Sequence, residues 1–207
     1  MSARRLEHTP LVAILRGLTP PEAVAVAGAL RQAGVTCLEV PLNSPKPLDS
    51  IAAIRAHLGD ALYVGAGTVL SAKEVHEAAA AGAQFIVSPN TDTDVIRATK
   101  HHELESMPGF FTATEGLAAA RAGGDALKLF PAEGAGPAHL KALKAVLPRD
   151  LPVFAVGGVT QATMGAWIAA GAAGFGVGGA LYKPGDQAQG VAAKAAAFVE
   201  AFNRARR

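Results

Sequence analysis

One lysine stands in a stretch of the chain that otherwise predicts a buried strand. Lys128 lies within Asp125-Ala126-Leu127-Lys128-Leu129-Phe130-Pro131. Burying an ammonium group is costly, so such a lysine is paired with a carboxylate, directed into a polar cavity, or held neutral by a lowered pKa. A neutral amine is a nucleophile that can form a Schiff base with a carbonyl compound. The alternative is a structural lysine, ion-paired or extended towards solvent at a strand end.

A second ionisable residue lies in another predicted strand. Glu39 is flanked by Cys37-Leu38 and Val40-Pro41-Leu42, so alternation places its side chain on the face opposite Leu38 and Val40. If that face is the interior of a barrel, the carboxylate and the amine of Lys128 form an acid/base pair in which each pKa depends on the other group. A buried salt bridge that only neutralises two charges is the alternative. Two ionisable groups at the ends of different strands favour catalysis.

Two glycine pairs, Gly157-Gly158 and Gly178-Gly179, follow the last two predicted strands. At this position parallel barrels build a phosphate site from backbone N–H groups and a helix N-terminus. Each pair taken alone is more typical of a tight turn, but two pairs after adjacent strands favour phosphate binding. Gly65-Ala66-Gly67 also resembles part of a nucleotide loop, although Gly-x-Gly alone is a weak signal.

Short β-rich runs alternate with helical patterns along the whole chain. The predicted strands are Leu11–Leu15, Cys37–Pro41, Tyr63–Ala66, Phe85–Val87, Leu104–Met107, Ala126–Leu129, Val153–Val156 and Gly174–Val177. The predicted helices are Pro21–Ala33, Leu48–Leu58, Ala72–Ala81, Thr93–His101, Thr114–Ala122, Pro137–Val146, Ala162–Ala170 and a final helix over Gln187–Arg204. Thr19 to Glu22 and Ser71 to Glu74 are typical of helix starts, and Gly34, Gly82 and Gly171 follow predicted helix ends.

This alternation predicts one α/β domain over residues 1–207, a closed (β/α)8 TIM barrel, with an open doubly wound sheet as the alternative. Active sites of such barrels lie at the carboxyl ends of the strands. The residues expected to converge there are Arg16, Glu39, Asn43, Thr68, Pro89, Asn90, Thr112, Glu115, Lys128 and the two glycine pairs.

Composition excludes several classes of protein. Half of the chain is apolar, the net charge is only +2, and the basic clusters, Arg4-Arg5 and Arg204 to Arg207, lie at the termini, so we expect no nucleic-acid partner. The single Cys37 cannot form an internal disulfide, which favours a reducing cytoplasm. We expect no signal sequence and no membrane span.

No histidine has metal-ligand spacing with an acidic residue at a strand end. The histidines lie at the N-terminus, on predicted helices or near helix ends: His8, His57, His76, His101, His102 and His139. We therefore expect no metal.

Several segments occur in the order found in one enzyme family. They are Ile14-Leu15-Arg16-Gly17, Leu38-Glu39-Val40-Pro41-Leu42-Asn43-Ser44-Pro45, Gly65-Ala66-Gly67-Thr68-Val69-Leu70, Val87-Ser88-Pro89-Asn90, Leu127-Lys128-Leu129-Phe130-Pro131 and Val156-Gly157-Gly158-Val159. From about Leu11 to Gly185 the chain resembles the class I aldolases of 2-dehydro-3-deoxy-6-phosphogluconate and 2-dehydro-3-deoxy-6-phosphogalactonate. The resemblance implies cofactor-independent cleavage to pyruvate and D-glyceraldehyde 3-phosphate, usually by a homotrimer.

The resemblance also implies a role for each site residue. Lys128 would form the Schiff base and Glu39 would be the general acid/base. Arg16 and Thr68 would hold the carboxylate of the pyruvate portion, and Pro89 and Phe130 would shape the pocket. Gly157, Gly158, Gly178 and Gly179 would surround the phosphate.

Within that family the chain is similar to the galactonate branch. The gluconate enzymes typically have an arginine where this chain has Asn43 and a threonine where it has Val156. The family often has a phosphate-binding serine where this chain has Gly179. Cleavage of the gluconate epimer or of 4-hydroxy-2-oxoglutarate is the alternative activity. Two further classes of protein would suit the same barrel: an isomerase or phosphate-binding synthase, and a sugar-phosphate sensor without catalytic activity.

Overall fold

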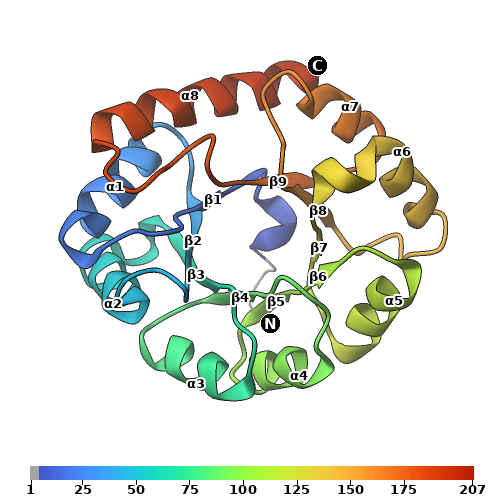
Figure 1. Cartoon of the computed structure of the whole chain (residues 1–207), viewed down its shortest axis with the longest axis horizontal. Coiled ribbons are helices and arrows are strands. Elements are labelled where there is room, and N and C mark those ends of the chain that lie inside the picture. Colours follow the sequence, from blue (N-terminus) through green and yellow to red (C-terminus); the bar gives the residue numbers. More distant parts are fainter. Residues whose placement is uncertain (1–4) are drawn as a thin grey trace.

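The computed structural model describes residues 5–207, so Arg4 of the N-terminal basic pair lies outside the described residues. Short parallel strands form one curved sheet in the order β5-β4-β3-β2-β1-β9-β8-β7-β6. They are β1 (Leu11–Ile14), β2 (Cys37–Pro41), β3 (Tyr63–Gly67), β4 (Phe85–Val87), β5 (Glu105–Met107), β6 (Gly109–Phe110), β7 (Leu127–Leu129), β8 (Val153–Val156) and β9 (Gly174–Val177). Figure 1 looks into this ring of strands, with the helices arranged around it.

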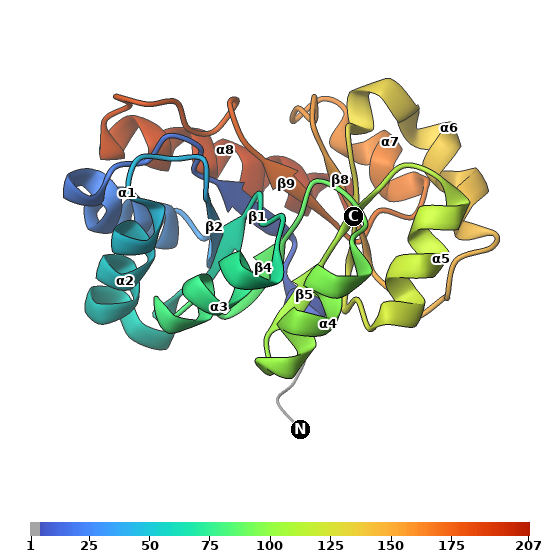
Figure 2. The same cartoon turned by 60° about the horizontal axis from the view of Figure 1, so that its bottom comes forward.

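The helices follow the strands and cover the outside of the sheet, as Figures 1 and 2 show from two directions. They are α1 (Pro20–Gln32), α2 (Pro47–Leu58), α3 (Ala72–Ala80), α4 (Thr93–His101), α5 (Ala113–Ala122), α6 (Ala132–Lys144), α7 (Met164–Ala169) and α8 (Ala188–Ala205). Because the sheet is buried on both faces, most residues of its strands are apolar, which is typical of parallel sheets.

The structure has one short strand, β6, that the sequence did not predict. The sequence predicted a fifth strand over Leu104–Met107, whereas the structure has β5, then Pro108, then β6. β5 pairs with β4, and β6 pairs with β7. Proline has no N–H and therefore interrupts the ladder, but the Pro108 carbonyl still accepts a hydrogen bond from Lys128 N at 2.9 Å. The ring of strands closes through this segment, which confirms the (β/α)8 barrel and excludes the open doubly wound sheet.

Two helices differ from the predicted ranges by more than one residue at an end. α6 begins at Ala132 rather than Pro137, and Gly136 within it has non-helical dihedral angles of φ 77° and ψ 161°. A proline is favourable in the first turn of a helix, so the predicted start at Pro137 is the start of the regular part of α6. α7 covers Met164–Ala169 and is shorter than the predicted Ala162–Ala170.

The predicted helix boundaries that rested on capping are confirmed. Thr19 and Glu22 form a capping box at the start of α1, and Ser71 accepts a hydrogen bond from Glu74 N at the start of α3. The residues just past three helix ends have positive φ, as a glycine allows: Gly34, Gly82 and Gly171.

Apolar side chains fill the barrel in two regions. The larger one lies between the sheet and the helices. The smaller one fills the barrel interior and includes Leu6, Val12, Phe85, Met107 and Phe154. Leu6 belongs to a short 3₁₀ helix, Leu6–His8, that precedes β1 and lies inside the ring in Figure 1. This helix closes the end of the barrel at which the strands begin.

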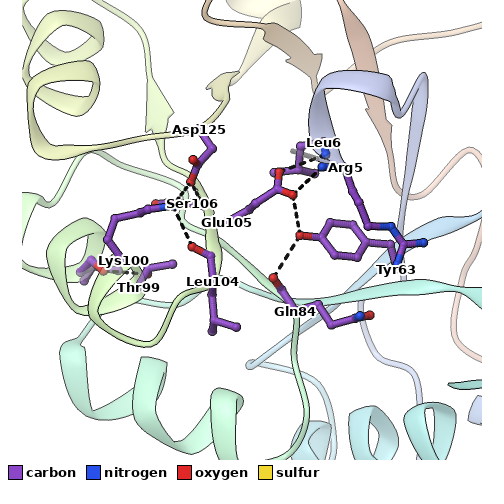
Figure 3. Close-up of polar contacts among 11 residues, drawn as sticks. Arg5, Leu6, Tyr63, Gln84, Thr99, Lys100, Leu104, Glu105, Ser106 and Asp125 are labelled. Carbon is purple, nitrogen blue, oxygen red and sulfur yellow. Dashed lines mark hydrogen bonds and ion pairs between the residues drawn. The ribbon is translucent and has the colours of Figure 1, made fainter. Parts of the chain in front are cut away.

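A carboxylate fixes the closing segment to the barrel, as Figure 3 shows. Glu105 accepts hydrogen bonds from the backbone N–H groups of Arg5 and Leu6, at 2.6 and 3.0 Å. The Tyr63 hydroxyl lies 2.9 Å from the same carboxylate and 3.1 Å from the Gln84 carbonyl. Burial and the neighbouring Glu105 charge raise the pKa of Tyr63, so the hydroxyl keeps its proton and acts as a donor.

Replacing this carboxylate tests its structural role. Glu105→Ala would leave the backbone N–H groups of Arg5 and Leu6 without their acceptor and the Tyr63 hydroxyl with only the Gln84 carbonyl. We therefore expect the free energy of unfolding to fall by about 2–4 kcal/mol. Urea denaturation measures the change. Glu7→Ala, at an exposed position of the same segment, is the matched control and should cost less than about 0.5 kcal/mol. Equal losses in both variants would contradict the assignment.

Candidate active site

The two ionisable side chains predicted from the sequence lie inside the barrel. Lys128 is 5% exposed and Glu39 is 2% exposed. Both belong to strands whose neighbours alternate between the barrel interior and the outer core: Cys37, two residues before Glu39, lies in the interior cluster, whereas Leu38 and Val40 lie in the outer core. The face inferred for Glu39 from alternation is therefore confirmed.

The carboxylate of Glu39 occupies space left by a glycine on the neighbouring strand. Pro41, two residues after Glu39, pairs with Gly67, and a Cβ atom on Gly67 would lie only 1.6 Å from Glu39 Oε2. A Cβ atom on Gly65 would contact the Phe85 ring at 2.5 Å. The segment Gly65-Ala66-Gly67 is therefore no nucleotide loop: its glycines make room for two inward side chains.

Burial shifts the two ionisable groups in opposite directions. Desolvation raises the pKa of Glu39, and the positive charges of Lys128 and Arg16 oppose that shift. Desolvation lowers the pKa of Lys128; the Glu39 charge opposes the shift and the Arg16 charge adds to it. Glu39 Oε2 has no hydrogen-bond partner among the described residues. No ion pair between Glu39 and Lys128 is formed within residues 5–207, so the two groups influence each other through space.

Arg16 lies at the mouth of the barrel and joins the ends of three strands. Its Nη1 donates to Asn43 Oδ1 at 2.6 Å, and its Nη2 lies 3.5 Å from Thr68 Oγ1. These residues follow β1, β2 and β3 respectively. Thr68 has a positive φ of 56°, a strained conformation for a β-branched residue and one often found at functional sites. The structure thus brings together a guanidinium, an amide and a hydroxyl predicted separately from the sequence.

A pocket of about 360 Å³ lies at the ends of β1, β8 and β9. Its lining includes Arg16, Phe130, Val156 and both predicted glycine pairs, together with Ile14, Val159, Thr160, Gly176, Val177 and Ala180. Gly157 and Gly158 have φ values of 102° and 68°, which favour glycine. The pocket brings together residues from both predicted phosphate loops, as the sequence indicated.

Phe130 connects this pocket to the buried amine. Its ring lines the pocket, and the Lys128 Nζ lies 4.9 Å from the ring centroid. The aromatic face stabilises the protonated amine and shields it from water on one side. A ligand with its reactive carbon at Lys128 could extend past Phe130 towards the glycine pairs.

Some predicted residues have different roles or positions. Thr112 and Glu115 form a capping box at the start of α5, and two backbone N–H groups lower the Glu115 pKa. Pro89 is half-buried, Asn90 is exposed, and neither lines the glycine pocket. Pro89 as a pocket residue stays a prediction.

Sequence reasoning missed Ile14 and Ala180 in the pocket and missed the space that Gly67 leaves for Glu39. Alternation along β3 was the available signal for Gly67, since Tyr63, Gly65 and Gly67 share one face of the strand. Among residues 5–207, no group of three or more histidine, cysteine, aspartate or glutamate side chains is placed to hold a metal ion.

A parallel barrel of nine short strands with a buried lysine, a buried glutamate and a glycine-lined pocket at its mouth has the architecture of a barrel enzyme. The family model described as "KDPG and KHG aldolase" matches residues 3–194. The chain belongs to this family of aldolases.

Individual relatives agree with this assignment. The 2-dehydro-3-deoxy-6-phosphogalactonate aldolase of Escherichia coli (strain K12) is 50% identical over 95% of this chain and 96% of its own length. A solved structure described as "Native KDPGal structure" superposes with a TM-score of 0.93 at 49% identity, covering 95% of this chain and 96% of that one. A cube-shaped protein cage designed by fusing symmetric oligomeric domains matches with a TM-score of 0.94 at 49% identity, covering 96% of this chain and 73% of that one.

The electrostatic coupling between the buried groups predicts a pH effect. Because the Glu39 charge raises the Lys128 pKa, Glu39→Gln should lower that pKa further, whereas Arg16→Gln should raise it. Competitive acetylation of Lys128, followed by mass spectrometry between pH 6 and 11, gives the midpoint for each variant. Shifts of the same sign in both variants would contradict the electrostatic account.

The hydrogen bond between Arg16 and Asn43 predicts a binding effect. Asn43→Ala would free the guanidinium, and we expect KM for a 2-keto acid substrate to rise by about 5- to 20-fold, or about 1–2 kcal/mol, with a smaller change in kcat. Steady-state kinetics measure both constants. Asn90→Ala, at another exposed mouth position, is the control and should change neither.

Proposed function

We propose that this protein is a class I aldolase that cleaves 2-dehydro-3-deoxy-6-phosphogalactonate to pyruvate and D-glyceraldehyde 3-phosphate. One observation carries the proposal: an amine with a lowered pKa, Lys128, is buried at the mouth of the barrel beside a carboxylate with a raised pKa. Family membership and the 50% identity to the Escherichia coli enzyme of that name support it.

The reaction begins at the buried amine. The neutral Lys128 Nζ attacks the C2 ketone of the substrate and forms a carbinolamine. Glu39 transfers protons, through a water molecule, during carbinolamine formation and dehydration. A carboxylic acid with a raised pKa can donate the proton that leaves with the hydroxyl as water, and can then accept one. The product is a protonated imine between Lys128 and C2.

The imine then serves as the electron sink for carbon–carbon cleavage. Removal of the proton from the C4 hydroxyl releases the aldehyde and breaks the C3–C4 bond, and the bonding electrons move into an enamine. Protonation at C3 and hydrolysis of the imine release pyruvate and the free amine. No step needs a metal or another cofactor.

Binding groups at the mouth hold the two ends of the substrate. Arg16, held by Asn43 and close to Thr68, binds the carboxylate next to the ketone, which orients C2 towards Lys128. Pro89 and Phe130 border the reacting carbons. The phosphate is bound by the backbone N–H groups of Gly157, Gly158, Gly178 and Gly179. At position 179 this chain offers no serine hydroxyl as a further donor.

We further propose one domain over residues 1–207, assembled as a homotrimer and working in the cytoplasm. The match to a cage built from fused symmetric oligomeric domains supports an oligomer. The free thiol of Cys37 is buried, and burial with the neighbouring Glu39 charge raises its pKa, which suits a reduced structural cysteine. No helix of the described residues is long and apolar enough to cross a membrane.

A covalent trap tests the proposed reaction. With pyruvate and borohydride, we expect one reduced pyruvyl adduct per chain, mapped to Lys128 by mass spectrometry, because this amine is buried at the mouth with its pKa lowered. Lys128→Met should form no adduct, lose all turnover and keep its circular dichroism spectrum. Turnover with chelator present should be unchanged.

The same trap separates the competing classes of protein. Lys100→Met is the matched control. Because Lys100 is paired with Asp125, it should not react itself, and the variant should still form the adduct at Lys128. An isomerase, a synthase or a sugar-phosphate sensor would give no adduct at Lys128. An adduct at Lys100, Lys141 or Lys144 would overturn the assignment of the site.

Val156 generates a prediction about the C4 epimer. Its buried side chain lines the pocket and offers an apolar wall where a threonine would offer a hydroxyl. Since apolar contacts discriminate weakly, we expect the galactonate epimer to be preferred by roughly 10- to 200-fold in kcat/KM. Val156→Thr should narrow that ratio. A lactate-dehydrogenase-coupled assay with both epimers and with 4-hydroxy-2-oxoglutarate measures kcat/KM for each substrate. An unchanged ratio in Val156→Thr would show that residues other than Val156 discriminate between the epimers.

A further inference from the structure

An acidic side chain with no place in the proposed reaction lies against the first glycine pair. Glu133 is in the first turn of α6, which begins beside β8 (Figure 1). A Cβ atom built on Gly158 would lie 2.6 Å from both the Cβ and the Oε2 atoms of Glu133. Since a Cα–Cβ bond is about 1.5 Å long, the carboxylate oxygen lies within about 4 Å of the Gly158 backbone. Glu133 therefore lies against the loop that contributes Gly157 and Gly158 to the pocket lining.

The pocket contains little positive charge to offset this carboxylate. Arg16 is the one charged residue in the described lining, and it is already hydrogen-bonded to Asn43. The remaining lining consists of glycine backbone, apolar side chains and Thr160. A phosphate group seated on Gly157 and Gly158 would thus experience a nearby charge of the same sign. A neutral polyol end would experience no such repulsion.

We propose that Glu133 is a specificity-determining residue of this site. Its charge weakens binding of a phosphate and so reduces the advantage of a phosphorylated substrate over an unphosphorylated one of the same carbon skeleton. The inference rests on the proposed function for its kinetic consequence, whereas its electrostatic part concerns only anion binding at the glycine pairs.

The expected effect is moderate because Glu133 is exposed to solvent. At a separation of about 6 Å in water, the interaction of a carboxylate with a phosphate changes affinity by roughly 3- to 10-fold, and salt screens it. Glu133→Gln keeps the shape of the side chain and removes its charge. Glu7→Gln makes the same change of net charge at an exposed position before β1, at the opposite end of the barrel.

Direct binding tests the electrostatic part without any catalysis. Inorganic phosphate is titrated into the wild-type protein and both variants, and the affinity is followed by isothermal titration calorimetry at low and high salt. We expect Glu133→Gln to bind phosphate about 3- to 10-fold more tightly than wild type at low salt. The difference should disappear near ~1 M salt, and Glu7→Gln should match wild type. Equal affinities in all three proteins, or weaker binding by Glu133→Gln, would overturn the proposal.

Kinetics test the consequence for specificity. With 2-dehydro-3-deoxy-6-phosphogalactonate, Glu133→Gln should show a lower KM, and with the same compound lacking its phosphate KM should not change. An equal change with both substrates would indicate a rearranged loop and overturn the proposal. Glu133→Ser, a second neutral variant with a shorter side chain, should also lower KM for the phosphorylated substrate. Agreement between the two variants would attribute the effect to the lost charge and not to the changed shape of the side chain. A wild-type protein without aldolase activity would refute the proposed function, while the phosphate titration would still decide the electrostatic part.

Discussion

Keeping a lysine and a glutamate out of water imposes the main constraint on this barrel. Desolvation of each charged form costs several kcal/mol, and their interior surroundings are apolar side chains such as Ile14, Val87 and Val156. The resulting shifts oppose each other: the carboxyl pKa rises and the ammonium pKa falls. The free-energy difference between the charged and the neutral forms of the pair is therefore reduced. Small differences of this kind are what allow a site to accept and return a proton within one reaction cycle.

Arg16 links this buried pair to the solvent. Its charge lowers the pKa of both Glu39 and Lys128, and its hydrogen bonds fix it across the ends of β1, β2 and β3. A substrate carboxylate bound to the guanidinium would neutralise that charge. Binding would then raise the pKa values of both Glu39 and Lys128. The protonation of the buried pair would therefore depend on whether the mouth is occupied.

The parts of the fold that follow from periodicity could be predicted from the sequence. Alternation around Glu39 correctly placed its side chain inside, and the capping residues marked the starts of α1 and α3. Pro108 shows the limit. This residue without an N–H separates β5 from β6 while leaving the barrel closed, and the local sequence pattern did not reveal β6 as a second short strand. Contacts between segments distant in sequence could not be predicted either. The space that Gly67 leaves for Glu39 and the position of Glu133 against Gly158 depend on how strands and loops pack, not on spacing within one element.

The closing segment at the start of the barrel has a practical consequence. Glu7 and His8, before β1, line the same cavity as Phe202 and Arg206 near the end of α8. The first and last described elements therefore border one cavity at the end of the barrel opposite its mouth. Proximity of the first and last elements of a fold favours circular permutation and insertion into a host protein. A linker that joined the Leu6–His8 helix to α8 here would leave the route into the mouth unobstructed, so this barrel is suited to display on a surface or a scaffold with its open end facing the solution.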